Sequence, residues 1–234
     1  MAENNLIYRA LIQITDKHPG IRLGIADIGY SRFSDEYSHA LVFAIPHRKV
    51  FSFGNYSEQE FDNFINAAQR EASEIVTEVT AFLDNQDIQH IVPPLAQTDE
   101  KHLLAPFSFK YAAVNAGLGW IGKNGVLITQ EYGPRVRLSA VLVKHPLPAA
   151  KPICKSLCPE NCFRCVDACP YHALKGTQWD VHKQREEIID YQLCNLERSK
   201  FLKNHGRKNA CGLCMAACPI GIVTNSPNRS NKGE

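Results

Sequence analysis

The chain has 234 residues, of which 44% are hydrophobic and 21% charged, and its formal net charge at pH 7 is +2. This is the composition of a folded globular protein, and no apolar run approaches the roughly 20 residues that a membrane span requires. The first residues are polar and then amphipathic, unlike a secretory signal, so we expect a cytoplasmic protein with no membrane partner.

The first 147 residues alternate between helical and strand patterns. In chain order, the spacing of apolar residues predicts a helix over 6–17, strands over 21–29 and 39–46, a helix over 57–85, a strand over 88–94, a helix over 107–116, and strands over 125–129 and 136–144. The long helix begins with Ser57 and Glu60, a capping-box pattern. Gly117 provides a left-handed cap, and residues 130–134 could join the last two strands as a hairpin.

These patterns predict a mixed fold of class α/β (α+β) with two domains. Residues 1–147 would form an α/β sandwich that binds a cofactor, and a proline-rich linker, 145–152, leads into a cysteine-rich domain over 148–222. The second domain should contain a helix near 182–205. The polar tail, 223–234, is expected to be disordered.

Charge is distributed unevenly along the chain. Residues 1–150 carry 13 basic and 16 acidic side chains, a net charge of −3, whereas residues 151–234 carry 13 basic and 8 acidic side chains, a net charge of +5. A basic region can bind nucleic acid. The better explanation is charge compensation, because a four-iron cluster with four thiolates carries about −2 and two such clusters would offset most of the excess.

All nine cysteines lie between Cys154 and Cys218. Their odd number and the absence of a secretory signal disfavour a disulfide framework. Closely spaced cysteines in a reducing compartment favour metal binding. Paired C-x2-C spacings also occur in zinc sites, but two C-x2-C-x3-C-P endings are typical of iron–sulfur proteins.

The cysteine motifs predict two [4Fe-4S] clusters with crossed ligands. In ferredoxins that hold two clusters, the cysteine that precedes proline binds the cluster of the other motif. Each motif here ends in that way, at Cys169 and at Cys218, and Cys194 supplies the missing thiol. Cys154 could replace Cys158, although Cys158 gives the more usual spacing. The predicted ligands are Cys158, Cys162, Cys165 and Cys218 for cluster one, and Cys169, Cys194, Cys211 and Cys214 for cluster two.

A glycine-rich segment, "NAGLGWIGKNGVLI" (115–128), precedes the cysteines. Close glycines permit positive φ angles and let the backbone approach a bound group. The segment contains G-x-G-x-x-G, but a helix precedes it and a strand follows, which is the reverse of a dinucleotide-binding motif. A tight helix-to-strand turn is the alternative to a cofactor-binding loop. The candidate cofactor-binding residues are Gly117, Leu118, Gly119, Trp120, Gly122, Lys123 and Asn124.

The string "KYAAVNAGLGWIGKNGVLI" and the two cysteine motifs resemble the epoxyqueuosine reductase family, which are cobalamin-dependent iron–sulfur proteins related to reductive dehalogenases. The close match covers about residues 107–219. The resemblance implies a nitroreductase-like α/β domain joined to a ferredoxin-like module. It also implies a base-off cobalamin against the glycine segment, with one cluster close enough to reduce it.

Two features depart from that family. The general-acid aspartate of the family aligns with Leu103, which cannot donate a proton, so Asp99 and His102 are the candidate catalytic residues. The family also continues into a helical-repeat region that helps to hold tRNA, whereas this sequence ends 15 residues after Pro219. A small-molecule or corrinoid acceptor is therefore favoured over tRNA.

We therefore expect an iron–sulfur oxidoreductase. Electrons would enter from an external donor and pass through two clusters to a bound corrinoid or substrate. The alternatives are a non-catalytic electron carrier of the ferredoxin type and a protein that delivers cobalamin.

Overall fold

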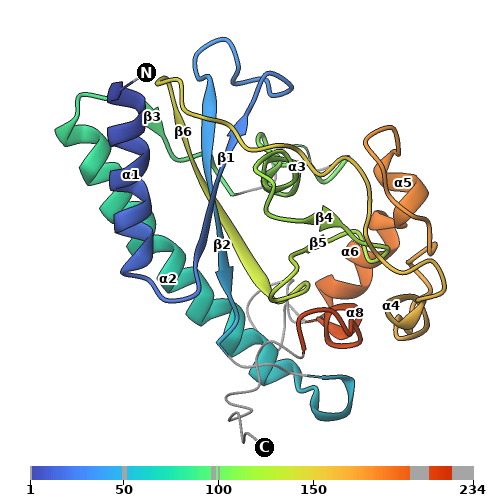
Figure 1. Cartoon of the computed structure of the whole chain (residues 1–234). Helices are drawn as coiled ribbons and strands as arrows, with labels where there is room; N and C mark the ends of the chain where they lie inside the picture. The colour runs from blue at the N-terminus through green and yellow to red at the C-terminus, as the bar shows by residue number, and fades with distance from the viewer. Residues whose placement is uncertain (1, 49–51, 96–98, 100, 201–210, 223–234) are drawn as a thin grey trace, which may run out of the picture.

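The computed structural model describes residues 2–48, 52–95, 99, 101–200 and 211–222. Its centre is a four-stranded antiparallel sheet with the order β1-β2-β6-β3 (Figure 1). The strands are β1 (Arg22–Asp27), β2 (His39–Pro46), β3 (His90–Ile91) and β6 (Val136–Val143). The prediction of β2 is confirmed to the residue, whereas only two residues of the predicted 88–94 strand pair with β6.

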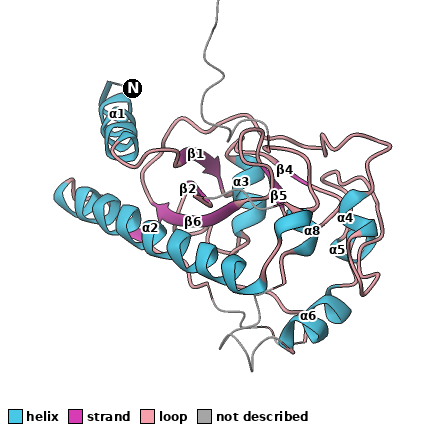
Figure 2. Cartoon of the chain, turned by 90° about the horizontal axis from the view of Figure 1, so that it is seen from below, coloured by secondary structure: helices cyan, strands magenta, loops and turns pink. Residues whose placement is uncertain are grey.

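Helices cover both faces of this sheet. Helices α1 (Ala2–Asp16) and α2 (Glu58–Asn85) lie on one face, and α3 (Phe109–Asn115) lies on the other (Figure 2). Strand β2 packs against both layers, because alternate side chains point to opposite faces of a strand. Phe43 thus packs with α1 and α2, whereas Val42 packs with α3. The mixed fold predicted from the sequence is confirmed at this level.

One half of the capping box predicted at the start of α2, the bond made by the Ser57 side chain, is confirmed. The Ser57 side chain accepts a hydrogen bond from the Glu60 amide at 3.4 Å, which satisfies one of the amides that a helix start leaves unpaired. Beyond this cap, an apolar stripe that includes Ile75 and Leu83 is completely buried against the sheet. Local capping and periodicity therefore define this helix.

The predicted hairpin between residues 125–129 and 136–144 is wrong. Strand β5 (Leu127–Ile128) pairs instead with β4 (Trp120–Ile121) in a separate two-stranded sheet, whereas β6 pairs with β2 and β3. The reason is the close approach that Gly119 permits. A Cβ at Gly119 would lie 2.1 Å from the carbonyl oxygen of Ile128, so only glycine lets this turn fold back onto β5.

The cysteine-rich region is built from short helices, namely α4 (Arg164–Asp167), α5 (Arg185–Ile188), α6 (Tyr191–Ser199) and α8 (Leu213–Ala216). The helix predicted near 182–205 is confirmed in part: α5 and α6 lie within this range, but the chain leaves α5 in an extended conformation and Asp190 caps a new helix. The Asp190 carboxylate accepts from the Leu193 amide at 2.9 Å. Residues 201–205 and the tail, 223–234, lie outside the described residues.

The short 3₁₀ helix η1 (Phe53–Asn55) lies just before α2. None of the helices that the structure describes has both the length and the apolar character that a membrane crossing requires.

Candidate metal centres

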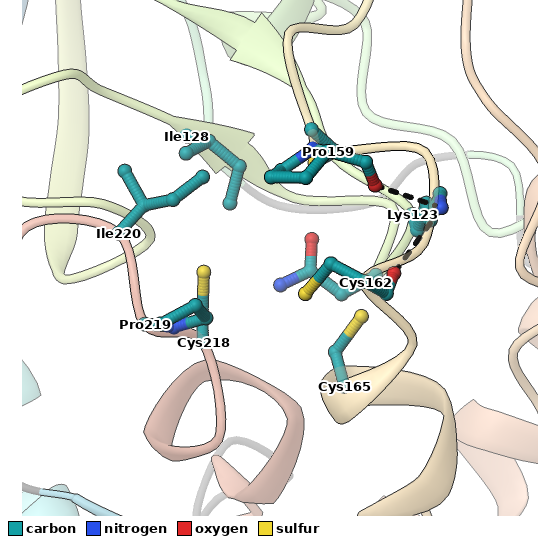
Figure 3. A pocket seen from close by; sticks show the side chains of 10 residues that line it. Lys123, Ile128, Pro159, Cys162, Cys165, Cys218, Pro219 and Ile220 are labelled. Atoms are coloured by element: carbon teal, nitrogen blue, oxygen red, sulfur yellow. Dashed lines mark hydrogen bonds between the residues drawn. The ribbon is translucent and has the colours of Figure 1, made fainter.

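Four thiols that are far apart in the sequence line one cavity. Cys158, Cys162 and Cys165 come from the first motif, and Cys218 comes from the second. Figure 3 shows the sulfur atoms of Cys162, Cys165 and Cys218 directed into the same space. The structure thus brings together the four residues predicted to hold cluster one. Cys154, the alternative to Cys158, is exposed and does not line this cavity.

The walls of the cavity are largely apolar. Ile128, Pro159, Pro219 and Ile220 surround the thiols, and Cys218 is only 7% exposed. Burial, and to a smaller extent the neighbouring sulfurs of the same group, raises the pKa of Cys165 to about 12. Thiolates at this position therefore require a cationic partner, and the iron of a cluster would provide one.

A second group forms next to the first. Burial is the main cause of the raised pKa of Cys214, and Cys211, Cys194 and Cys169 contribute as neighbouring sulfurs. Cys194 reaches this group from α6, and Cys214 reaches it from α8. The four residues predicted to hold cluster two are thus brought together. Cys165 also affects the pKa of Cys214, so the two groups are adjacent.

A buried indole packs beside one of the thiols of the first cavity. Trp120 is 3% exposed and packs in one buried cluster with Cys218, and its indole nitrogen has no hydrogen-bond partner among the described residues. A group bound beside Cys218 would provide this acceptor, although Trp120 is not among the residues that line the cavity.

Lys123 fastens the first cysteine loop. Its side chain is buried, and its ammonium donates to the carbonyl oxygens of Pro159 at 3.2 Å, Glu160 at 2.6 Å and Cys162 at 3.1 Å. Figure 3 shows the bonds to Pro159 and Cys162. The ammonium also lies 4.1 Å from the centroid of the Phe163 ring. Three bonds use all three donors of a lysine. Pairing with an anionic ligand, one role considered for Lys123, would therefore break part of this clamp.

Arg135 fastens the second cysteine loop, and sequence reasoning did not identify it. Its guanidinium donates to the carbonyl oxygens of Cys218 at 2.6 Å, Ile220 at 2.8 Å and Met215 at 3.3 Å. The residue is 1% exposed. One indication of its role was present in the sequence, because a basic residue directly before the buried strand β6 needs a partner. The sequence does not reveal that the partners lie 80 to 85 residues away.

The glycine segment owes its composition to packing within the chain. Gly117 and Gly125 have φ angles of +67° and +70°, which favour glycine. A Cβ at Gly119 or Gly122 would meet Ile128, at 2.1 and 2.7 Å respectively. The tight-turn interpretation therefore accounts for all four glycines. Of the other candidate residues here, Lys123 and Asn124 line the first cavity, and Leu118 packs with α3.

The two candidate catalytic residues form an exposed pair. Nδ1 of His102 lies 2.7 Å from Oδ2 of Asp99, and the His102 amide also donates to this carboxylate, which lowers the pKa of Asp99. Arg185 of α5 donates to the carbonyls of His102 and Leu103, so the pair is held against the cysteine-rich region. Neither residue lines the first cysteine cavity.

Comparisons with known proteins agree with the resemblance. No family model matches the chain. An epoxyqueuosine reductase from Synechococcus sp. (strain RCC307) is 39% identical over 115 residues, which are 49% of this chain and 35% of that protein. A tetrachloroethene reductive dehalogenase from Sulfurospirillum multivorans is 35% identical over 119 residues, 46% of this chain and 22% of that protein.

A solved structure of epoxyqueuosine reductase from Bacillus subtilis has a similar fold, with a TM-score of 0.59 and 17% sequence identity over 96% of this chain and 68% of that one. The aligned region of this chain spans only about a third of the curated epoxyqueuosine reductase that it matches.

Proposed function

We propose that this chain, which resembles the epoxyqueuosine reductase family over about half of its length, is an iron–sulfur oxidoreductase that transfers electrons through two [4Fe-4S] clusters to a bound acceptor. The observation that carries the proposal is the arrangement of eight cysteines in two adjacent groups, each with thiols from both parts of the cysteine-rich region. Four cysteines are the usual ligand set of a cubane. In this proposal, the sheet with its helices is the nitroreductase-like domain, and the short helices form the ferredoxin-like module.

Cluster one would be held by Cys158, Cys162, Cys165 and Cys218, and cluster two by Cys169, Cys194, Cys211 and Cys214. When bound, each cluster accepts and releases single electrons. The chain's own residues would hold the loops, exclude water with the apolar walls of the first cavity and compensate part of the charge. An external reductant would supply the electrons.

The acceptor is a corrinoid or a small molecule in this proposal. A reductive dehalogenase of similar fold is associated with B12-dependent dehalogenation, and another solved structure holds epoxyqueuosine reductase with a modified tRNA stem loop. Those ligands belong to the relatives, and we propose a corrinoid here by resemblance. A proton donor would be His102, with Asp99 orienting its Nδ1.

A non-catalytic electron carrier is the second candidate. Two observations favour it, namely that the four glycines are used by packing within the chain and that Leu103 stands where the family has its acid. A protein that delivers cobalamin is a third class, distinguished from the carrier by cofactor binding.

Anaerobic reconstitution tests these proposals. Iron and sulfide in equal amounts, about eight of each per chain, are expected for two clusters, and a colourless protein without iron after loading would reject the proposal. Reconstitution with cobalamin comes next. A corrinoid spectrum retained through gel filtration supports the enzyme or the delivery protein, and its loss supports the carrier. Turnover of epoxyqueuosine-containing tRNA with a strong reductant then separates the enzyme from the delivery protein.

A further inference from the structure

Two buried cations hold the two loops that supply the thiols of the first cysteine cavity. Lys123 holds the loop that carries Cys162, and Arg135 holds the loop that carries Cys218. Their exposed fractions are 2% and 1%. Carbonyl oxygens satisfy the hydrogen bonds of a buried cation without cancelling its charge. Both positive charges are therefore available to act on whatever the cavity holds.

The contacts of Lys123 and Arg135 also orient backbone groups of the two cysteine loops. The carbonyl of Ile220 binds Arg135, and the amide of the same residue donates to the sulfur of Cys218. At the other loop, three backbone carbonyls accept hydrogen bonds from the Lys123 ammonium. Hydrogen bonds to cluster sulfurs and nearby charge are two of the factors that set the potential of an iron–sulfur cluster.

We infer that Lys123 and Arg135 are positioning residues that raise the reduction potential of the cluster in the first cavity. The inference rests on the proposed function, because it requires that cluster. Reduction adds one electron from the external reductant and changes the charge of a cubane with four thiolates from about −2 to about −3. A fixed positive charge in a poorly solvated site stabilises the more negative state. Each cation thus favours the reduced cluster, and no proton is transferred.

The second cysteine group is expected to respond differently. Its neighbouring cations are Arg198, which acts on the Cys194 thiol, and Lys110. Lys123 and Arg135 instead bind the carbonyls of the two loops that enclose the first cavity. Removing either charge should therefore lower the reduction potential of cluster one. The reduction potential of cluster two should stay almost unchanged in both variants.

The test is an anaerobic redox titration of the reconstituted full chain, followed by electron paramagnetic resonance. The neutral variants K123Q and R135Q keep a hydrogen-bond donor, and the conservative variants K123R and R135K keep the charge. Arg70, which is exposed on α2, provides the control R70Q. At a fixed potential, each neutral variant should lower the ratio of reduced to oxidised cluster one about tenfold, which is 59 mV for one electron. The conservative variants and R70Q should remain within about twofold of the wild type.

The outcomes separate this inference from the proposed function. A wild-type chain without iron overturns the proposed function itself. The inference alone is overturned if both clusters keep their wild-type reduction potentials in K123Q and R135Q. It is also overturned if the glutamine and the conservative variants shift the potential of cluster one equally, because that would indicate a purely structural role. If both glutamine variants lose cluster one while K123R and R135K retain it, the requirement for a positive charge is supported.

Discussion

Trp120 packs against Cys218 in a buried cluster, with its indole N–H lacking an acceptor among the described residues. An unpaired buried donor costs about 1–3 kcal/mol, so this N–H is expected to find an acceptor when the metal site is filled. Trp120 thus packs the glycine segment against Cys218, one of the thiols of the first cavity.

The substitution W120F tests whether this indole donates to a cluster sulfur. Loss of such a bond should lower the reduction potential of cluster one, because hydrogen bonds to the sulfurs stabilise the reduced state. Anaerobic redox titration measures the shift. Trp179 provides the matched control, because W179F makes the same chemical change at a residue that is buried on the α3 face of the sheet. An intact cluster with an unchanged potential in W120F would show that the indole donates elsewhere.

Cys194 and Cys154 offer a sharp contrast within the cysteine-rich region. Cys194 lies with the second group on α6, whereas Cys154 is exposed. C194S should lose cluster two and therefore about half of the iron, because each cubane needs four ligands. C154S should retain all of it. Iron and sulfide analysis after reconstitution, together with the number of titrating species, checks both variants.

The reverse result for this pair, with full iron in C194S and loss in C154S, would contradict the crossed ligand set. It would place Cys154 among the ligands in spite of its exposure.

His47 should make folding stability depend on pH. Burial, and to a smaller extent the charges of Arg135 and Arg137, lowers its pKa from the ordinary value of 6.5 to about 4. Between these two pH values the unfolded chain binds a proton that the folded chain does not, so stability falls as the pH decreases from 6.5 to 4. The loss attributable to His47 is on the order of 3 kcal/mol.

Denaturant unfolding of the wild type and of H47Q, compared at each pH, measures this contribution. The comparison cancels any loss of stability that acid causes by releasing iron from both proteins. The free energy of unfolding of H47Q, relative to that of the wild type, should therefore rise as the pH falls. A constant difference between the two proteins across this range would mean that His47 becomes protonated in the folded state without cost.

Local patterns explain what sequence reasoning predicted correctly. Strand β2 was identified to the residue because its run of apolar residues from Ala40 is buried on both faces, and α2 was identified from its cap and its apolar period. The grouping of the cysteines also followed from local spacing together with the crossed-ligand rule. The strand, the helix and each single cysteine motif depend on residues that are close together in the chain, whereas joining Cys218 to the first motif relied on the crossed-ligand rule.

Contacts between distant segments explain what was missed. The partner of β5 depends on the fit of Gly119 against Ile128, which spacing alone does not reveal. Arg135 binds carbonyls of residues 80 to 85 positions away, so no motif near it indicates the clamp. Lys123 was singled out from its motif, but its carbonyl partners were not anticipated.

Gly119 allows a direct choice between the two interpretations of the glycine segment. A Cβ there would lie 2.1 Å from a backbone oxygen that cannot rotate away, so G119A should destabilise the folded protein by about 3 kcal/mol. G54A is the matched control, because a Cβ at Gly54 meets no atom within 4 Å, and its stability should change by less than about 0.5 kcal/mol. Anaerobic thermal unfolding followed by circular dichroism measures both. If G119A is as stable as the wild type but loses cobalamin binding, the segment is a cofactor-binding loop after all, and the packing explanation is wrong.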